Sequence, residues 1–237
     1  MLSKIIDEAR EYTRPIVILY RMKDGRVESN IGTFFHIDDL GHILSASHIF
    51  KKGSEDPIIE TSLIFDDRYS EAQYVADDPT NDIVLIKIKN YKPGSIKTFP
   101  KFLNSLVTEL PRGTTLVRLG YPRGEPYSHI PATWDEKEKC FILGKNVRVT
   151  CYHNEGTVID YVDRESDFRL IEISSPALMG QSGGPILTHK GIVVGLQSRN
   201  TGFGLPTKSV LETGLAISHI AIARFLEKIP TVRPTWA

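Results

Sequence analysis

After its first dozen residues the chain is a succession of short runs rich in β-branched and aromatic residues, and this pattern constrains the fold most. Turn-forming glycine, proline, asparagine and aspartate separate the runs. The predicted strands are Pro15–Arg21, Asn30–Ile37, His42–Ser45, Thr61–Phe65, Ile83–Ile88, Thr115–Leu119, Cys140–Leu143, Val147–Tyr152, Gly156–Val162, Leu170–Ile173, Ile186–Leu187 and Ile192–Leu196. No helical pattern lies between successive strands, which argues against a parallel sheet with crossover helices. The sequence therefore predicts an all-β fold of the barrel or sandwich type.

Helical patterns are confined to the two ends of the chain. Residues 2–12 repeat apolar side chains at helical spacing, with polar residues between them, and predict one amphipathic helix. A second helix is predicted from Ser218 to Lys228, because Ser218 is a suitable N-cap and Pro230 stops further winding.

Composition excludes several classes of partner. The 237 residues contain 29 basic and 29 acidic side chains, and a formal net charge of zero gives no general attraction to nucleic acid or to anionic membranes. Asp7, Glu8 and Arg10 interrupt the apolar stretch that a secretion signal needs. The two cysteines, Cys140 and Cys151, are compatible with a reducing compartment, so we expect a cytoplasmic protein.

The two cysteines also flank a predicted hairpin with its turn near Lys145 and Asn146. A two-residue turn there would place Cys140 opposite Cys151, and a cross-strand disulfide is geometrically conceivable. The absence of a recognisable secretion signal favours two reduced thiols instead.

The most specific string in the chain is GQSGGP, residues 180–185. A serine hydroxyl becomes a useful nucleophile when a base takes its proton and when backbone N–H groups point at the developing oxyanion. Glycines on both sides let the backbone turn sharply and approach a substrate closely. We predict that Ser182 is the nucleophile and that the N–H groups of Gly180 and Ser182 form the oxyanion hole. The alternative is a glycine-rich turn that happens to contain a serine.

Two further residues complete this prediction. His48 follows the predicted strand 42–45 and is therefore positioned but accessible, as a general base must be. Asp82 begins the apolar strand 83–88 and would orient the histidine and stabilise its protonated form. Each alone has a simpler interpretation, a loop histidine or a strand-capping aspartate. In the order His48, Asp82, Ser182 the three motifs indicate a catalytic triad.

Together these motifs resemble the chymotrypsin-like (trypsin-like) serine peptidases, most closely the protease domains of bacterial Deg/HtrA-type enzymes. The segments LGYPRG (119–124), GTVI (156–159), GLQS (195–198) and GLAI (214–217) also look like that group's second-barrel motifs. The resemblance implies two antiparallel six-stranded β-barrels, one at 14–103 with His48 and Asp82 and one at 113–217 with Ser182. A helix at 1–13, a connector at 104–112 and a helix and tail at 218–237 complete the expected division. No PDZ domain is expected after Ala237.

The resemblance further implies a serine endopeptidase that cleaves protein or peptide substrates through an acyl-enzyme, with no cofactor and no metal. The residues implied for substrate binding are Pro176, Ala177, Gln197, Ser198, Arg199, Asn200, Gly214 and Ala216. Pro176 stands where trypsin-like enzymes carry an aspartate, and Gln197 where glutamate-specific members carry a histidine. We therefore expect an aliphatic P1 side chain, that of the residue preceding the scissile bond. Glu212, if turned inward, would favour a basic one.

Control of activity is expected to differ from that of trypsin zymogens. In those enzymes a freed N-terminus pairs with an aspartate just before the catalytic serine, and here that position holds Gln181. The uncleaved chain should therefore be active, or be switched by loop ordering, a regulatory partner or homo-oligomerisation.

Two other functions stay open at this point. The string GQSGG also matches the G-x-S-x-G motif of α/β-hydrolase esterases, although that fold needs a helix directly after the serine and the order Ser, Asp, His. A non-catalytic, peptidase-like binding module would keep the three residues in a distorted site. Labelling with a fluorophosphonate separates an active hydrolase from a binding module.

Overall fold

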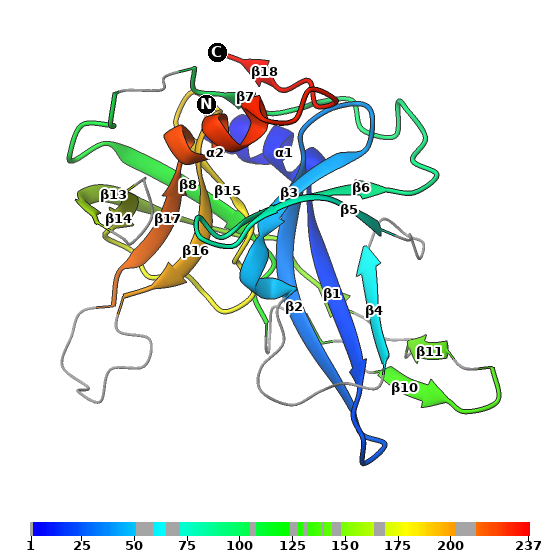
Figure 1. Ribbon diagram of the computed structural model, residues 1–237. Coiled ribbons are helices and arrows are strands. Elements are labelled where there is room, and N and C mark those ends of the chain that lie inside the picture. The colour runs from blue at the N-terminus through cyan, green and yellow to red at the C-terminus, as the bar shows by residue number, and fades with distance from the viewer. Residues whose placement is uncertain are drawn as a thin grey trace.

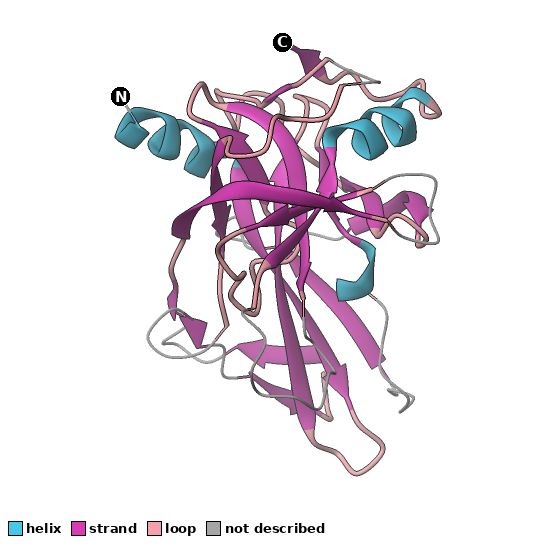
Figure 2. Ribbon diagram, turned by 90° about the vertical axis from the view of Figure 1, so that its left-hand side faces the viewer, coloured by secondary structure: helices cyan, strands magenta, loops and turns pink. Residues whose placement is uncertain are grey.

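Antiparallel β-sheet is the main secondary structure of the molecule, with one helix near each end of the chain (Figures 1 and 2). The structure is a computed structural model that describes residues 2–50, 59–64, 72–104, 108–123, 128–129, 132–138, 140–143, 148–163, 169–201 and 212–237. The predicted all-β, chymotrypsin-like fold is confirmed, with one helix before the main strands in the sequence and one after them. No helix in these ranges has the length and apolar character needed to cross a membrane.

The first sheet carries the N-terminal half of the candidate site. Its six strands have the order β4-β1-β2-β3-β6-β5, and every neighbouring pair is antiparallel. The strands are β1 (Thr13–Arg21), β2 (Val27–His36), β3 (His42–Ala46), β4 (Ile59–Ile64), β5 (Ala72–Asp78) and β6 (Ile83–Ile88). All five residues of β3 are buried. A short 3-10 turn, η1 (Ser47–Ile49), follows at once.

The second sheet is closed by β15, which pairs with both β8 and β16. Its six barrel strands are β8 (Thr115–Gly120), β13 (Tyr152–Val162), β14 (Leu170–Ile173), β15 (Pro185–Thr188), β16 (Ile192–Asn200) and β17 (Gly214–Ser218). Two short strands, β7 (Lys101–Phe102) and β18 (Thr235–Trp236), extend this sheet beside β16. β7 thus joins the second sheet, although it lies in the range 14–103 expected for the first barrel.

The two predicted helices form where the sequence places them. α1 (Leu2–Tyr12) buries Ile6, Ala9 and Tyr12, and its chain runs directly into β1. α2 (His219–Glu227) begins at Ser218, whose hydroxyl oxygen accepts a hydrogen bond from the Ala221 N–H. Both helices and both chain ends lie at the same end of the molecule, near β7 and β18 (Figure 1).

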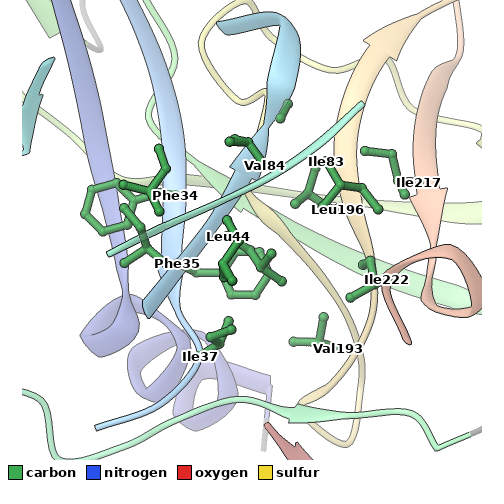
Figure 3. Packing of buried hydrophobic residues seen from close by; sticks show 14 of the residues in the cluster. Phe34, Phe35, Ile37, Leu44, Ile83, Val84, Val193, Leu196, Ile217 and Ile222 are labelled. Atoms are coloured by element: carbon green, nitrogen blue, oxygen red, sulfur yellow. The ribbon is translucent and has the colours of Figure 1, made fainter. Parts of the chain in front are cut away.

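One hydrophobic core joins the two sheets. Phe34, Leu44 and Ile83 from the first sheet pack in the same cluster as Leu196 and Ile217 from the second, and all are at most 1% exposed (Figure 3). Each fully buried aliphatic or aromatic side chain of this size contributes roughly 1.5–3 kcal/mol. The shared core therefore holds the two sheets in a defined position relative to each other, and residues from both can build one site.

The predicted hairpin between the cysteines is wrong. β11 (Cys140–Leu143) pairs with β10 (Ala132–Asp135), so Cys140 lies opposite Asp135 and not opposite Cys151. The predicted strand 147–152 is also divided. β12 (Arg148–Val149) pairs with β9 (Ser128–His129), whereas Tyr152 begins β13. The expected turn at Lys145 and Asn146 lies outside the described residues. The sequence analysis did not predict β10, and it therefore assigned β11 to the wrong neighbouring strand.

Cys151 is a free thiol. Burial raises the pKa of this thiol, against the opposing effect of the nearby Arg10 charge. The observation agrees with the expectation that Cys151 is reduced.

Candidate active site

A cleft of about 660 Å³ contains all three predicted triad residues. Residues of the first sheet and its turns form one side, and the loop before β15 and the end of β16 form the other. The lining residues are Asn30, Ile31, His48, Ile49, Pro79, Asp82, Ala177, Leu178, Met179, Gly180, Ser182, Ser198, Arg199, Asn200 and Glu212. The fold therefore brings together residues that are far apart in sequence.

The pairing of β3 with β6 places His48 beside Asp82. Ala46, the last residue of β3, lies opposite Ile83, the first residue of β6, so the residues just beyond them meet. The His48 backbone N–H donates to Asp82 Oδ1 at 2.8 Å, and His48 Nδ1 lies 2.8 Å from Asp82 Oδ2. Asp82 has φ +61°, a left-handed conformation that aspartate tolerates better than most residues. The ring of His48 is thus held in a fixed orientation by one carboxylate.

Asp82 is buried and ionised. Its side chain is 8% exposed, and burial alone would raise the pKa of the carboxyl. Hydrogen bonds and charge from His48, together with a hydrogen bond from Ser198, outweigh burial and lower the pKa. The Ser198 hydroxyl donates to Asp82 Oδ2 at 2.5 Å. Ser198 was expected to bind substrate, and its contact with Asp82 was not foreseen from the sequence.

The loop that carries Ser182 depends on its glycines. Gly180 and Gly183 have φ of +96° and +84°, which disfavour any residue with a Cβ atom. A Cβ on Gly183 would also lie 2.0 Å from the Thr33 carbonyl oxygen. Only glycine lets this loop pack so closely on β2, which explains the GQSGGP string.

The Ser182 hydroxyl does not contact His48 in this structure. It donates instead to the Ser198 carbonyl oxygen at 2.8 Å, and no hydrogen bond to His48 is present among the described residues. Catalytic hydrogen bonds are often long or absent before substrate binds. The structure therefore brings His48, Asp82 and Ser182 into one cleft and pairs the first two.

The backbone around Ser182 leaves two donors free. Within the described part of the chain, the N–H groups of Gly180 and Ser182 have no acceptor, whereas the Gln181 N–H between them donates to the Leu178 carbonyl oxygen at 3.0 Å. Two neighbouring unpaired donors at a cleft are what an oxyanion hole requires.

Thr33 on β2 braces this loop, a role that the sequence did not reveal. Its backbone N–H donates to the Ser182 carbonyl oxygen at 2.8 Å, and its hydroxyl donates to the Gly180 carbonyl oxygen at 2.9 Å. The same hydroxyl oxygen accepts from the Tyr121 N–H at 2.9 Å. Thr33 is fully buried, so the first sheet fixes the position of the loop of the second.

The side chain of Gln181 also stabilises the Ser182 loop. The Leu178 N–H donates to Gln181 Oε1 at 2.8 Å, and Gln181 Nε2 donates to Asn154 Oδ1 at 3.3 Å. Asn154 Nδ2 lies 3.2 Å from the Pro176 carbonyl oxygen. Neutral side chains therefore support the loop at the position that an ion pair holds in trypsin-type enzymes.

The eight residues expected to bind substrate divide into two groups. Ala177, Ser198, Arg199 and Asn200 line the cleft, and so does Glu212. The other four, Pro176, Gln197, Gly214 and Ala216, do not line it. Gln197 and Ala216 are fully buried, and Gln197 Nε2 donates to the Leu215 carbonyl oxygen at 3.1 Å. Gln197 and Ala216 were expected to bind substrate, and in this structure neither reaches the cleft.

Comparison with known proteins decides the family. A sequence profile described as "Trypsin-like peptidase domain" matches residues 32–196. The chain belongs to the trypsin-like peptidase family. A trypsin-like peptidase acts on proteins or peptides, and the match spans His48, Asp82 and Ser182.

The solved structures and curated proteins add two relatives of this trypsin-like peptidase. The crystal structure of the serine endoprotease from Yersinia pestis matches with a TM-score of 0.62 at 16% identity, over 96% of this chain and 66% of that one. "Uncharacterized protein y4bJ" of Sinorhizobium fredii is 29% identical over 168 residues, 71% of this chain and 22% of the relative. The chain thus spans about a fifth of that curated relative. The first likeness supports the fold, and this fold excludes the α/β-hydrolase alternative, which needs a parallel sheet.

Proposed function

We propose that this trypsin-like peptidase is a serine endopeptidase with His48, Asp82 and Ser182 as its triad and an acyl-enzyme as its intermediate. The observation that carries the proposal is the pairing of a buried, ionised Asp82 with His48 at 2.8 Å in the cleft that also contains Ser182. The two free N–H groups of Gly180 and Ser182 support it further.

In the first step His48 takes the proton of the Ser182 hydroxyl as Ser182 Oγ attacks the peptide carbonyl carbon. This requires Ser182 to rotate about its Cα–Cβ bond, from the Ser198 carbonyl oxygen toward the histidine ring. The N–H groups of Gly180 and Ser182 stabilise the oxyanion, and Asp82 stabilises the protonated ring. His48 then gives its proton to the leaving amine, the C–N bond breaks, and an ester on Ser182 remains.

The second step repeats this chemistry with water. His48 removes a proton from a water molecule, whose oxygen attacks the ester carbonyl carbon. The bond to Ser182 Oγ breaks, the serine oxygen recovers a proton from His48, and a carboxylic acid leaves. The same two N–H groups serve both steps, since the oxyanion forms at the same place.

A fluorophosphonate probe tests the proposal. The protein should be labelled at Ser182 and should cleave an unstructured protein substrate. Ser182→Ala and His48→Ala should reduce turnover by about a million-fold if the triad acts as a unit, and Asp82→Ala by somewhat less. Ser95→Ala replaces an exposed turn serine and is the matched control, which should keep both labelling and turnover. Retained turnover in Ser182→Ala would exclude the mechanism.

One observation favours a second candidate, a non-catalytic peptide-binding module. Ser182 donates to the Ser198 carbonyl oxygen and not to His48, as it would in a distorted site. A binding module would retain a peptide in the cleft without fluorophosphonate labelling, and Ser182→Ala would leave that binding unchanged. Labelling of Ser182 excludes this candidate.

We also propose a cytoplasmic location and control without proteolysis. The free Cys151 supports a reducing compartment. The neutral support of the Ser182 loop by Gln181 supports an active uncleaved chain, with a regulatory partner or homo-oligomerisation as the remaining routes of control.

A further inference from the structure

Asn200 joins two segments that lie on the same side of the active-site cleft. It ends β16, and its partner Ala177 precedes the Ser182 loop. The Ala177 N–H donates to Asn200 Oδ1 at 2.7 Å, and Asn200 Nδ2 donates to the Ala177 carbonyl oxygen at 2.9 Å. Two reciprocal hydrogen bonds of this length hold the Asn200 side chain between the end of β16 and the segment before the Ser182 loop.

Arg118 of β8 binds the segment that directly precedes Ala177. The guanidinium donates to the Pro176 carbonyl oxygen at 2.9 Å and to the Ser175 carbonyl oxygen at 3.3 Å. A Cβ added to Gly214 would lie 2.2 Å from Arg118 Nη2, so the guanidinium fills the space that a side chain at Gly214 would take. This arrangement explains why Pro176 and Gly214 do not line the cleft.

Arg118 is also a cation without an anion. It is 2% exposed, and in the part of the chain that the structure describes no carboxylate pairs with it. Burial lowers its pKa to about 10, which leaves the guanidinium charged near neutral pH. Its Nε has no hydrogen-bond partner among the described residues. A buried charge without a counter-ion repels a second cation and attracts an anion that can reach it.

We propose that Asn200 closes the P1 subsite above the buried Arg118 cation, so that this protein accepts small uncharged P1 side chains such as those of alanine and serine. Leucine and phenylalanine are too long for a subsite that ends at the bridge, and lysine and arginine would meet the guanidinium. The proposal rests on the proposed peptidase function. It narrows the expected aliphatic preference to alanine and adds serine, which is of similar size. It also predicts that an opened subsite accepts glutamate.

Peptidyl diphenyl phosphonates that differ only at P1 test the wild-type protein. Ser182 Oγ bonds to phosphorus and displaces phenoxide, while the serine proton passes to His48, so mass spectrometry of the modified protein gives the rate. The alanine probe should react fastest, and the leucine and phenylalanine probes roughly tenfold to hundredfold more slowly because they overfill the subsite. Leucine or phenylalanine reacting as fast as alanine would overturn the proposal.

Asn200→Gly tests the bridge and the cation together. The ratio of glutamate-probe to glutamine-probe rates should rise at least tenfold, since the two probes have the same shape and only one carries an anion. The double variant Asn200→Gly/Arg118→Met should lose this gain. Asn90→Gly, an exposed turn residue with φ +57°, is the matched control and should keep the wild-type ratio. An unchanged ratio in a folded Asn200→Gly variant would overturn the proposal.

Failure of this proposal is distinguishable from failure of the proposed function. If neither the alanine phosphonate nor a fluorophosphonate modifies Ser182, the peptidase proposal fails. If the fluorophosphonate reacts but the lysine probe is fastest and loses that advantage in Glu212→Gln, then Glu212 supplies an anion to the subsite and only the present proposal is overturned.

Discussion

Replacing His36 by phenylalanine should make the folded protein less sensitive to acid. His36 ends β2, is fully buried, and packs its ring 5.4 Å from that of Phe34 and 5.6 Å from that of Tyr91. Neither ring nitrogen has a hydrogen-bond partner among the described residues. Burial and, to a smaller extent, the charge of Arg14 lower the pKa of His36 from 6.5 to about 3, while Asp38 acts in the opposite direction.

The sign and size of the effect follow from proton linkage. Between pH 6.5 and pH 3 the unfolded chain binds a proton at His36 that the folded chain does not, so acid favours unfolding. The neutral form thus contributes stability that is present above the unfolded pKa and is lost as the pH falls below it. From pH 7.5 to pH 4 the loss in the free energy of unfolding amounts to about 3 kcal/mol.

Urea unfolding at pH 7.5, 6, 5 and 4 measures this. His36→Phe keeps a ring of similar shape in the apolar contact, so its stability at pH 7.5 should lie within about 1.5 kcal/mol of wild type. Between pH 7.5 and pH 4 the difference in the free energy of unfolding between variant and wild type should shift by about 3 kcal/mol in favour of the variant.

The control for this experiment is Ser95→Ala. Ser95 is exposed and has no ionisable side chain, so this variant should keep the pH dependence of wild type. Carboxyls that do not interact with His36, such as Asp82, destabilise both proteins equally in acid and cancel in the comparison. Parallel pH profiles of wild type and His36→Phe would refute the reasoning.

Three further predictions concern the site. Thr33→Val removes two buried hydrogen bonds, one to the Gly180 carbonyl oxygen of the Ser182 loop and one from the Tyr121 N–H. It should lower the free energy of unfolding, measured in urea, by about 1–3 kcal/mol; a change below about 0.5 kcal/mol would contradict the bracing role. Because the pKa of Asp82 is lowered in the folded protein, its ionised form stabilises the fold above about pH 4. This stability is lost as the pH falls through the lower pKa of the folded state. Asp82→Asn should therefore unfold less steeply with falling pH, which circular dichroism measures. The chain beginning at Met1 should be labelled by a fluorophosphonate while uncleaved. Pro15 lies in β1, which pairs with both β2 and β4, so cleavage near this residue would cut a paired strand. N-terminal sequencing that finds only labelled protein cleaved near residue 15 would contradict this prediction.

Much of the architecture was accessible from local sequence signals. The strand Ile83–Ile88 and the helix 2–12 were located to the residue, because apolar periodicity reports directly which face of an element is buried. β5 was missed, since it lies at the end of its sheet and several of its side chains are exposed. The pairing of His48 with Asp82 was predicted from motif order and position, and in the structure their contact follows from the pairing of β3 with β6.

Only the tertiary structure decided what surrounds those motifs. The brace by Thr33 and the bond from Ser182 to the Ser198 carbonyl oxygen join residues of different strands and loops. Such contacts depend on how the sheets close and pack, and no local pattern encodes them.

The P1 subsite illustrates this division best. Arginine at position 118 is visible in the sequence as a charge within an apolar strand, but that pattern does not say whether the charge faces solvent or core. The barrel turns it inward, where its guanidinium donates to the Pro176 carbonyl oxygen and lies against Gly214, while Asn200 binds Ala177 next to it in the chain. The sequence thus determined the chemistry available to the site, whereas the three-dimensional packing determined the space in which that chemistry operates, because space is defined by residues from several strands at once.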